Sequence, residues 1–299
     1  MVKRQKREVK AIQEISFAIE EGELVGYIGP NGAGKSTTVK VMSGILTPEA
    51  GSCSILGRTP WKERTAHVSQ IGVVFGQRSQ LWWDVPVSDS FELLRDIYGI
   101  GGLAYRRRLE ELAQVLNLGE LLKTPVRQLS LGQRMRCEVA AALLHSPQIL
   151  FLDEPTIGLD AVSKLALREF LLRENREHGV TMILTTHDMD DVEALRSRVM
   201  TIGRGRLLFD GTLEQLRVHY APLHHIRATL EREADYREIA GTQRGSLQGR
   251  QYTAWFDAAQ LPAQTLVAAL AEAYPLRDIV IEEEDIDNLI AAMYPEMKI

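Results

Sequence analysis

Residues 24–36 read LVGYIGPNGAGKS, and this stretch decides the fold. Its apolar start predicts a buried β-strand, and the residues after it fit the pattern G-x-x-x-x-G-K-[ST] and open a helical run through Leu46. Glycines permit the positive-φ turns that direct successive backbone N–H groups toward one point, where the helix N-terminus adds positive charge. A structural glycine-rich turn is the alternative, but the strand–loop–helix context favours a phosphate-binding site. The residues expected to form it are Gly29, Pro30, Asn31, Gly32, Ala33, Gly34, Lys35, Ser36 and Thr37.

A pair of acids ends a second apolar strand, because residues 149–154 read ILFLDE. Strand alternation is expected to point the two carboxylates in different directions, so one can hold Mg²⁺ while the other orients water. In the template of P-loop nucleotide hydrolysis, Asp153 and the Ser36 hydroxyl ligate the metal, and Lys35 reaches the β- and γ-phosphates. Glu154 is then the candidate general base, a role that contributes ~10²–10⁴ in rate. Strand-ending acids are often merely solvated, so the upstream phosphate loop carries this interpretation.

Composition excludes several classes of protein. The 299 residues are 45% hydrophobic and 25% charged, and the net charge of −5 disfavours a broad nucleic-acid-binding face. The two cysteines, Cys53 and Cys137, match no disulfide framework or metal motif, so we expect reduced packing thiols. No run approaches ~18 consecutive apolar residues, and the start, MVKRQKREVKAI, lacks the apolar segment of a secretory signal. We therefore expect a soluble, intracellular protein.

Hydrophobic periodicity predicts an α/β protein followed by a smaller α+β domain. After residue 148 strands alternate with helices, which indicates a parallel sheet with right-handed crossovers. In the first part, strands are predicted at 11–20 and 24–28 (as a hairpin), 51–56, 71–75, 149–152 and 180–185, and helices within 88–146 and at 161–177 and 212–219. In residues 222–299, strands are predicted at 224–230, 251–256 and 276–282, helices at 262–273 and 285–294, and a loop at 241–249.

Further motifs lie in a fixed order around these elements. Gln77 follows the strand of 71–75, the run LSLGQ at 129–133 precedes an apolar helix, Gly158-Leu159-Asp160 follows the acids, and His187 follows the strand of 180–185. In this order and spacing, residues 5–215 resemble the ATP-binding cassette family. The stretches GVVFGQRSQLWWDVPVSDSFELL and RQLSLGQRMRCEVAAALLHSPQILFLDEPTIGLD resemble most closely the ATPase subunits of ABC-2 type exporters, such as those of the daunorubicin and viologen types.

The resemblance implies a P-loop NTPase cassette with an inserted helical subdomain at about 88–146. It assigns Gln77 to Mg²⁺ and the attacking water, and His187 to the γ-phosphate and to positioning water with Glu154. The alternative for His187 alone is a surface or capping histidine. The catalytic set is then Glu154, His187 and Gln77, and the metal set is Ser36, Gln77 and Asp153. The nucleotide-binding set gains Ser130, Gly132, Gln133 and Asp160.

The family also implies partners. Ser130 and Gly132 of one protomer face the γ-phosphate held by Lys35 of the other, so we expect a dimer of cassettes, a homodimer here, that sandwiches two ATP molecules with Mg²⁺. Integral membrane permease subunits would receive the force, which places the chain peripherally on the cytoplasmic face of the membrane. No nucleic-acid partner is expected. The alternatives are a non-transport cassette ATPase and a regulatory nucleotide-dependent dimer switch, although a switch does not need the positioned base Glu154.

Three features fit the family less directly. No aromatic residue precedes Phe17, so the residue that stacks on adenine is unassigned. Trp82 and Trp83 lie where the family receives its membrane subunit, and core packing is the alternative. The domain division is 1–221 for ATP binding and 222–299 for an accessory domain, for which dimer stabilisation or regulation is a hypothesis. His224 and His225 lack further ligands, so no metal site is predicted there.

Overall fold

The computed structural model describes residues 10–76, 78–195, 198–220, 223–283 and 293. Within these residues, the contacts divide the chain after Leu213 into two compact units. Helix α8 (Leu213–Tyr220) thus falls mostly in the second unit, whereas the sequence analysis placed it in the first. Each unit is described by itself.

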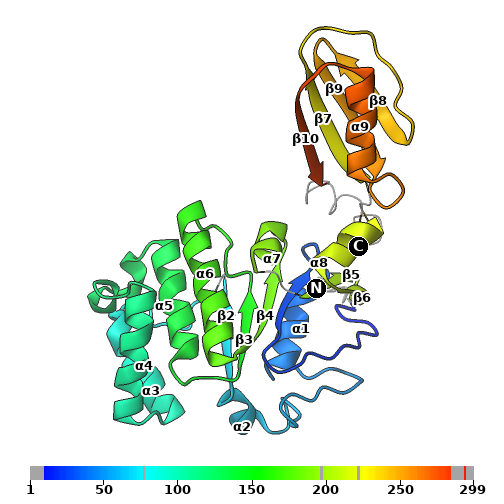
Figure 1. Ribbon diagram of the computed structural model, residues 1–299. Helices are drawn as coiled ribbons and strands as arrows, with labels where there is room; N and C mark the ends of the chain where they lie inside the picture. The colour runs from blue at the N-terminus through cyan, green and yellow to red at the C-terminus, as the bar shows by residue number, and fades with distance from the viewer. Residues whose placement is uncertain (1–9, 77, 196–197, 221–222, 284–292, 294–299) are drawn as a thin grey trace, which may run out of the picture. The chain divides into compact units, whose positions relative to one another are not determined.

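The first unit is built on a six-stranded sheet of order β2-β3-β4-β1-β5-β6 (Figure 1). β2, β3, β4, β1 and β5 run parallel, and β6 is antiparallel to β5. The strands are β1 (Leu24–Ile28), β2 (Ile71–Phe75), β3 (Ile149–Asp153), β4 (Thr181–Thr186), β5 (Arg198–Gly203) and β6 (Arg206–Gly211). The parallel arrangement predicted from the alternation after residue 148 is confirmed.

Helices cover both faces of this sheet, which explains why its strands read as continuous apolar runs. On one face, Leu150 and Leu152 of β3 pack in a core with the larger helices, and on the other Phe151 packs in a core with α1. The helices are α1 (Lys35–Met42), α2 (Arg64–Val68), α3 (Val87–Tyr98), α4 (Gly102–Val115), α5 (Leu131–Leu143), α6 (Ala161–His178) and α7 (Met189–Leu195), with 3₁₀ turns at Leu121–Lys123 and Val126–Gln128. Figure 1 shows α3, α4 and α5 grouped together, as the predicted helical subdomain requires.

Local signals set the boundaries of these helices. Ser130 caps α5 in a capping box, because its hydroxyl accepts from the Gln133 N–H while the Gln133 side chain accepts from the Ser130 N–H. α6 ends at Gly179, whose φ of 66° is the left-handed conformation that glycine adopts freely. Cys137 is fully buried in α5, and burial raises the pKa of its thiol to about 12, as expected of a packing residue.

Two strand predictions in this unit are wrong. Residues 10–20 contain no strand, so there is no hairpin before β1, although Gln13 N–H donates to Gly205 O at 2.7 Å. Instead of a strand at 51–56, the chain makes an isolated bridge between Ile55 and Arg58, closed by Leu56 and Gly57 at positive φ. In both places the sequence alternates, but the backbone does not form a continuous ladder of hydrogen bonds with a neighbouring segment. A strand requires such a ladder as well as the pattern.

The second unit is a four-stranded antiparallel sheet of order β10-β7-β9-β8 with α9 (Ala263–Ala273) packed on it. Its strands are β7 (Leu223–Leu230), β8 (Thr242–Gln248), β9 (Gln251–Asp257) and β10 (Leu276–Glu283). Alternate residues of β9 are buried, namely Tyr252, Ala254 and Phe256, and they pack with Leu266 and Leu270 of α9. These residues therefore form the α+β fold that the sequence predicts for this region.

The predicted loop at 241–249 is instead the edge strand β8. Its sequence, TQRGSLQ, is mostly polar, as suits an edge strand in which no residue is buried. Its pairing with β9 shifts register between Gln243 and Ser246. The helix predicted at 285–294 lies outside the described residues, apart from the buried Met293.

Candidate functional site: a phosphate-binding loop beside an acidic strand end

The carboxyl ends of β1, β3 and β4 meet at one edge of the sheet. The register places Asp153 of β3 beside Thr185 of β4, and Thr185 beside Tyr27 of β1. Because parallel strands all end on the same side, the segments that follow them are neighbours. The phosphate loop follows β1, the two acids end β3, and His187 follows β4.

The phosphate loop packs too tightly for side chains at two of its glycines. A Cβ on Gly29 would lie 2.3 Å from Ile202 O, and one on Gly34 would lie 2.5 Å from Ala11 O. Gly34 also has a φ of 113° and Gly32 a φ of 83°, which other residues rarely adopt. The loop therefore needs glycine where the sequence supplies it.

Lys35 begins α1 and is buried, with 4% of its side chain exposed. Its Nζ donates to Gly29 O at 2.6 Å and to Pro30 O at 3.3 Å, and it lies 3.5 Å from Glu154 Oε1. Burial lowers the pKa of this ammonium, while the Glu154 and Asp153 carboxylates oppose that effect. The result is a desolvated cation held inside the loop, which strengthens its attraction for an anion.

Asp153 is held by two hydroxyl groups. Ser36 Oγ donates to Asp153 Oδ1 at 3.0 Å, and Thr185 Oγ1 donates to the same oxygen at 2.6 Å. Ser36 and Asp153, predicted to share a metal, lie within hydrogen-bonding distance, whereas Thr185 was not predicted, because its position depends on the register between β3 and β4. Thr185 stands next to Thr186 and His187 in the sequence, and that polar end of an apolar strand is the signal that was available.

Glu154 points elsewhere than Asp153, as expected, but for a different reason. β3 ends at Asp153, and Glu154 has a φ of 52°, so the chain turns there rather than continuing the alternation of a strand. Its Oε1 lies 3.5 Å from Lys35 Nζ and 3.5 Å from His187 Nδ1. The Glu154 side chain is 17% exposed and the His187 side chain is half exposed, so both are accessible to a small molecule.

The turn of 129–133 makes its polar contacts away from this edge. Ser130 is exposed at the N-terminus of α5, and among the described residues no hydrogen bond or ion pair joins Ser130 or Gln133 to the phosphate loop. Gly132 is close to α6 instead, because a Cβ there would lie 2.7 Å from Ser163 Oγ.

Asp160 caps the N-terminus of α6 by accepting from Ser163 N–H at 2.8 Å. The hydrogen bonds from Ser163, its backbone N–H first, hold the pKa of the Asp160 carboxyl below its usual value. The turn of 130–133 and the cap of α6 are therefore neighbours within one chain. Neither contacts the loop of residues 29–37 in the described part of the chain.

Gln77 lies outside the described residues, but the segment after it is fixed to α5. The Glu138 carboxylate, buried in the middle of α5, accepts from the Ser79 hydroxyl and from Gln80 N–H, while Gln80 Nε2 donates to Glu138 O at 2.9 Å. Burial raises the pKa of the Glu138 carboxyl. The sequence analysis missed this link, because an acid within an apolar helix gives no indication of its partner.

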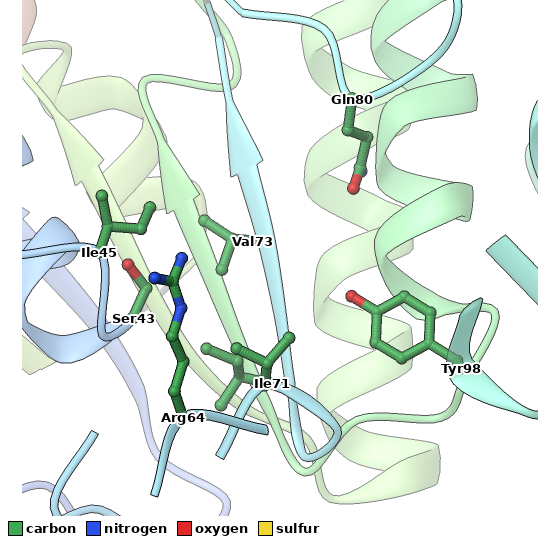
Figure 2. A pocket seen from close by; sticks show the side chains of 8 residues that line it. Ser43, Ile45, Arg64, Ile71, Val73, Gln80 and Tyr98 are labelled. Atoms are coloured by element: carbon green, nitrogen blue, oxygen red, sulfur yellow. The ribbon is translucent and has the colours of Figure 1, made fainter. Parts of the chain in front are cut away.

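Trp82 and Trp83 are exposed, 43% and 51%, so core packing is not their role. Trp83 lies under the guanidinium of Arg134, 5.9 Å from the ring centroid. Gln80, which precedes these tryptophans closely in the sequence, is one of the residues that line a cavity of about 200 Å³. Figure 2 shows Ile45 and Arg64 on one side of β2 and Gln80 and Tyr98 on the other, with Val73 of β2 between them.

The residues fit Mg²⁺ and a nucleotide phosphate. A hydroxyl and a carboxylate within hydrogen-bonding distance, Ser36 and Asp153, are the hard oxygen ligands that Mg²⁺ prefers. Among the described residues, no side chain caps the first turn of α1, so its backbone N–H groups are available to an anion. Together the loop, Lys35 and the acidic strand end define a P-loop nucleotide-binding protein.

Comparison with known proteins makes the assignment more specific. A family model described as "ABC transporter" matches residues 12–157. The ABC transporter ATP-binding protein NatA of Bacillus subtilis is 33% identical over 211 residues, 71% of this chain and 85% of NatA. The probable multidrug ABC transporter ATP-binding protein YbhF of Escherichia coli is 36% identical over 213 residues, and the matched part spans only 36% of YbhF. Relatives named for daunorubicin and doxorubicin resistance are 33% and 34% identical.

A solved structure is similar in fold as well. The ATP-binding cassette MJ0796, in a dimeric post-hydrolysis state bound to ADP and Pi, superimposes with a TM-score of 0.63 at 27% identity, covering 71% of this chain and 94% of that one. The chain therefore belongs to the family of ABC transporter ATP-binding proteins, whose members bind ATP. None of the described helices is both long and apolar enough to cross a membrane.

Proposed function

We propose that this chain hydrolyses Mg-ATP as one half of a cassette dimer and thereby powers an ABC-2 type exporter through a separate membrane permease. The observation that carries the proposal is the position of Glu154, whose Oε1 lies 3.5 Å from both Lys35 Nζ and His187 Nδ1, beside the Ser36–Asp153 pair. A chain that only binds nucleotide does not need a carboxylate held there.

The proposed roles are supported by the contacts of the described residues, and that of Gln77 rests on the family resemblance. Lys35 and the N–H groups of residues 29–37 bind the phosphates, and Ser36, Asp153 and Gln77 hold Mg²⁺, which neutralises charge on the phosphates when bound. Glu154 accepts a proton from the attacking water, and His187, whose Nδ1 lies 3.5 Å from Glu154 Oε1, orients that water. Positioning of this kind, rather than covalent chemistry, supplies most of the catalysis in phosphoryl transfer.

The second half of the site comes from another copy. Ser130, Gly132, Gln133 and Asp160 are accessible and remote from the loop of their own chain in the described contacts, while Ser130 lies at a helix N-terminus suited to an anion. In the proposed dimer they contact the γ-phosphate held by the partner. The dimeric cassette MJ0796, bound to ADP and Pi, supports this arrangement.

The permease is proposed to dock beside the segment that follows Gln77. Two exposed tryptophans and the cavity near Gln80 offer an aromatic and apolar surface, the composition enriched at interface cores. This attachment would hold the chain at the cytoplasmic face of the membrane, and relatives named for drug resistance favour export. Residues 1–221 would then form the ATP-binding domain and residues 222–299 an accessory domain.

The test is steady-state release of phosphate from Mg-ATP by the wild type and by Glu154→Gln. The substitution keeps the size of the side chain but removes the base, so turnover should fall ~10²–10⁴-fold with ATP affinity retained. Glu169→Gln, an exposed acid of α6, is the matched control and should turn over like the wild type. A wild type that binds ATP without hydrolysing it favours the regulatory switch, and a Glu154→Gln variant as active as the wild type removes Glu154 from the chemistry.

A further inference from the structure

Asp191 of α7 is a fully buried carboxylate outside the site described so far. Its Oδ2 accepts from Thr156 Oγ1 at 2.5 Å and from Thr186 Oγ1 at 3.2 Å, and its Oδ1 accepts from Arg168 Nε at 2.7 Å. A buried charge is costly unless it is paired and fully hydrogen-bonded, and Asp191 meets both conditions.

The two threonines give this carboxylate its significance. Thr156 is two residues after Glu154, and Thr186 is the residue before His187. One oxygen of Asp191 thus joins the segment that carries the proposed base to the segment that carries the proposed histidine. Both segments leave the sheet at its carboxyl edge, just past the backbone hydrogen bond from Glu154 N–H to Thr185 O at 3.0 Å.

Arg168 supplies the counter-charge from α6. Its guanidinium is 16% exposed and contacts the fully buried Asp191 through both Nε and a terminal nitrogen, which fixes the orientation of the carboxylate. The neighbouring pair Lys164–Asp188, at 2.5 Å, joins α6, one turn earlier, to the residue just before α7. In a low-dielectric interior such a network holds its members more rigidly than the separate contacts would.

We propose that Asp191, fixed by Arg168, is a positioning residue for hydrolysis: it sets the relative placement of Glu154 and His187. This inference rests on the proposed ATP hydrolysis. Asp191 touches neither the phosphate loop nor its lysine in the described contacts, so it acts on the catalytic step and not on ATP binding. A displacement of about 1 Å of a catalytic group costs on the order of 10²-fold in rate.

The experiment compares kcat and KM for Mg-ATP in the full chain with Asp191→Asn. This variant keeps the shape of the side chain but loses the charge that orients Arg168, so kcat should fall about 10- to 100-fold while KM for ATP changes less than about threefold. The matched control is Glu174→Gln. Glu174 of α6 is also buried and pairs with Arg108 of α4. This pair takes no part in the contacts at the sheet edge that forms the candidate site.

A second pair of variants makes smaller changes, so that a loss of activity is not explained by misfolding. Thr156→Val removes one hydroxyl and leaves the Asp191–Arg168 pair intact, and it should lower kcat about 3- to 10-fold. Its control is Thr201→Val, another fully buried threonine, whose hydroxyl has no hydrogen-bond partner among the described residues. That control should leave kcat unchanged.

A double-mutant cycle separates positioning from general destabilisation. If Asp191 acts through Glu154, Asp191→Asn should slow single-turnover hydrolysis much less in a Glu154→Gln background than in the wild type, because groups that act as a unit are not additive. Equal losses in both backgrounds, or a kcat for Asp191→Asn and Thr156→Val equal to their controls, would overturn the inference while the proposed function stands. A wild type without turnover would defeat both.

Discussion

The first unit gathers its charged and hydroxyl side chains at one edge of a parallel sheet, whereas the second unit distributes them over an antiparallel one. In the first, Asp153, Glu154 and His187 follow neighbouring strands that all end on the same side. In the second, strands that are neighbours in the sheet end on opposite sides, and its polar contacts include exposed pairs such as Arg227 with Glu282.

The difference shows that the direction of the strands in a sheet decides where polar side chains can gather into a site. A parallel sheet must leave its strands at a common edge, so each loop adds a group to the same place. An antiparallel sheet has no such common edge, and the second unit packs instead around a core that includes Tyr252, Phe256 and Leu266. We therefore infer that the first unit binds the nucleotide, while the second is organised around its own core.

The largest expected effect comes from removing one core aromatic residue from each unit. Phe151 of β3 and Phe256 of β9 are both fully buried, so either change to alanine should cost ~3–5 kcal/mol in the unit that holds it. Phe256→Ala should destabilise the second unit and leave ATP affinity within about twofold, whereas Phe151→Ala should weaken both stability and ATP binding. Chemical denaturation and ATP titration measure this, and equal losses of ATP affinity would break the comparison.

A smaller effect, on ATP affinity, tests the role of the phosphate loop in the first unit. Lys35→Ala removes the buried cation that the loop carbonyls hold, and charged hydrogen bonds of this kind contribute ~1.5–3 kcal/mol. ATP affinity should therefore fall about 10- to 100-fold, as measured by equilibrium titration. Lys40→Ala, a lysine of the same helix, is the control. If Lys35→Ala binds ATP like Lys40→Ala, the phosphates are not held where we place them.

Much of the candidate site could be predicted because its motifs are local. The phosphate loop, the ILFLDE strand end and the LSLGQ helix start each depend on a few consecutive residues whose geometry the backbone dictates. The same holds for β2, β3 and β4, whose apolar runs match strands covered on both faces.

The parts that were missed depend on pairing between distant segments. Thr185 meets Asp153 through the register between β3 and β4, and Thr156 after β3 meets Asp191 of α7, and no single stretch of sequence encodes either contact. β8 is a strand only because β9 pairs with it, and residues 11–20 fail to be one for want of such a ladder. Backbone hydrogen bonding is completed in three dimensions, so short polar or alternating segments are the least predictable.

The proposed dimer requires that the binding site of a nucleotide held by residues 29–37 of one chain be completed by the 129–133 turn of a second copy. Light scattering of Glu154→Gln with saturating Mg-ATP tests it most directly, with Ser130→Phe added in a second variant and Ser69→Phe, at an exposed helix-capping serine, as its control. We predict that Glu154→Gln doubles from its mass of 33.6 kDa with ATP, that the Ser69 variant does likewise, and that the Ser130 variant stays monomeric. A Glu154→Gln protein that remains monomeric, or a dimer indifferent to Ser130→Phe, would contradict it.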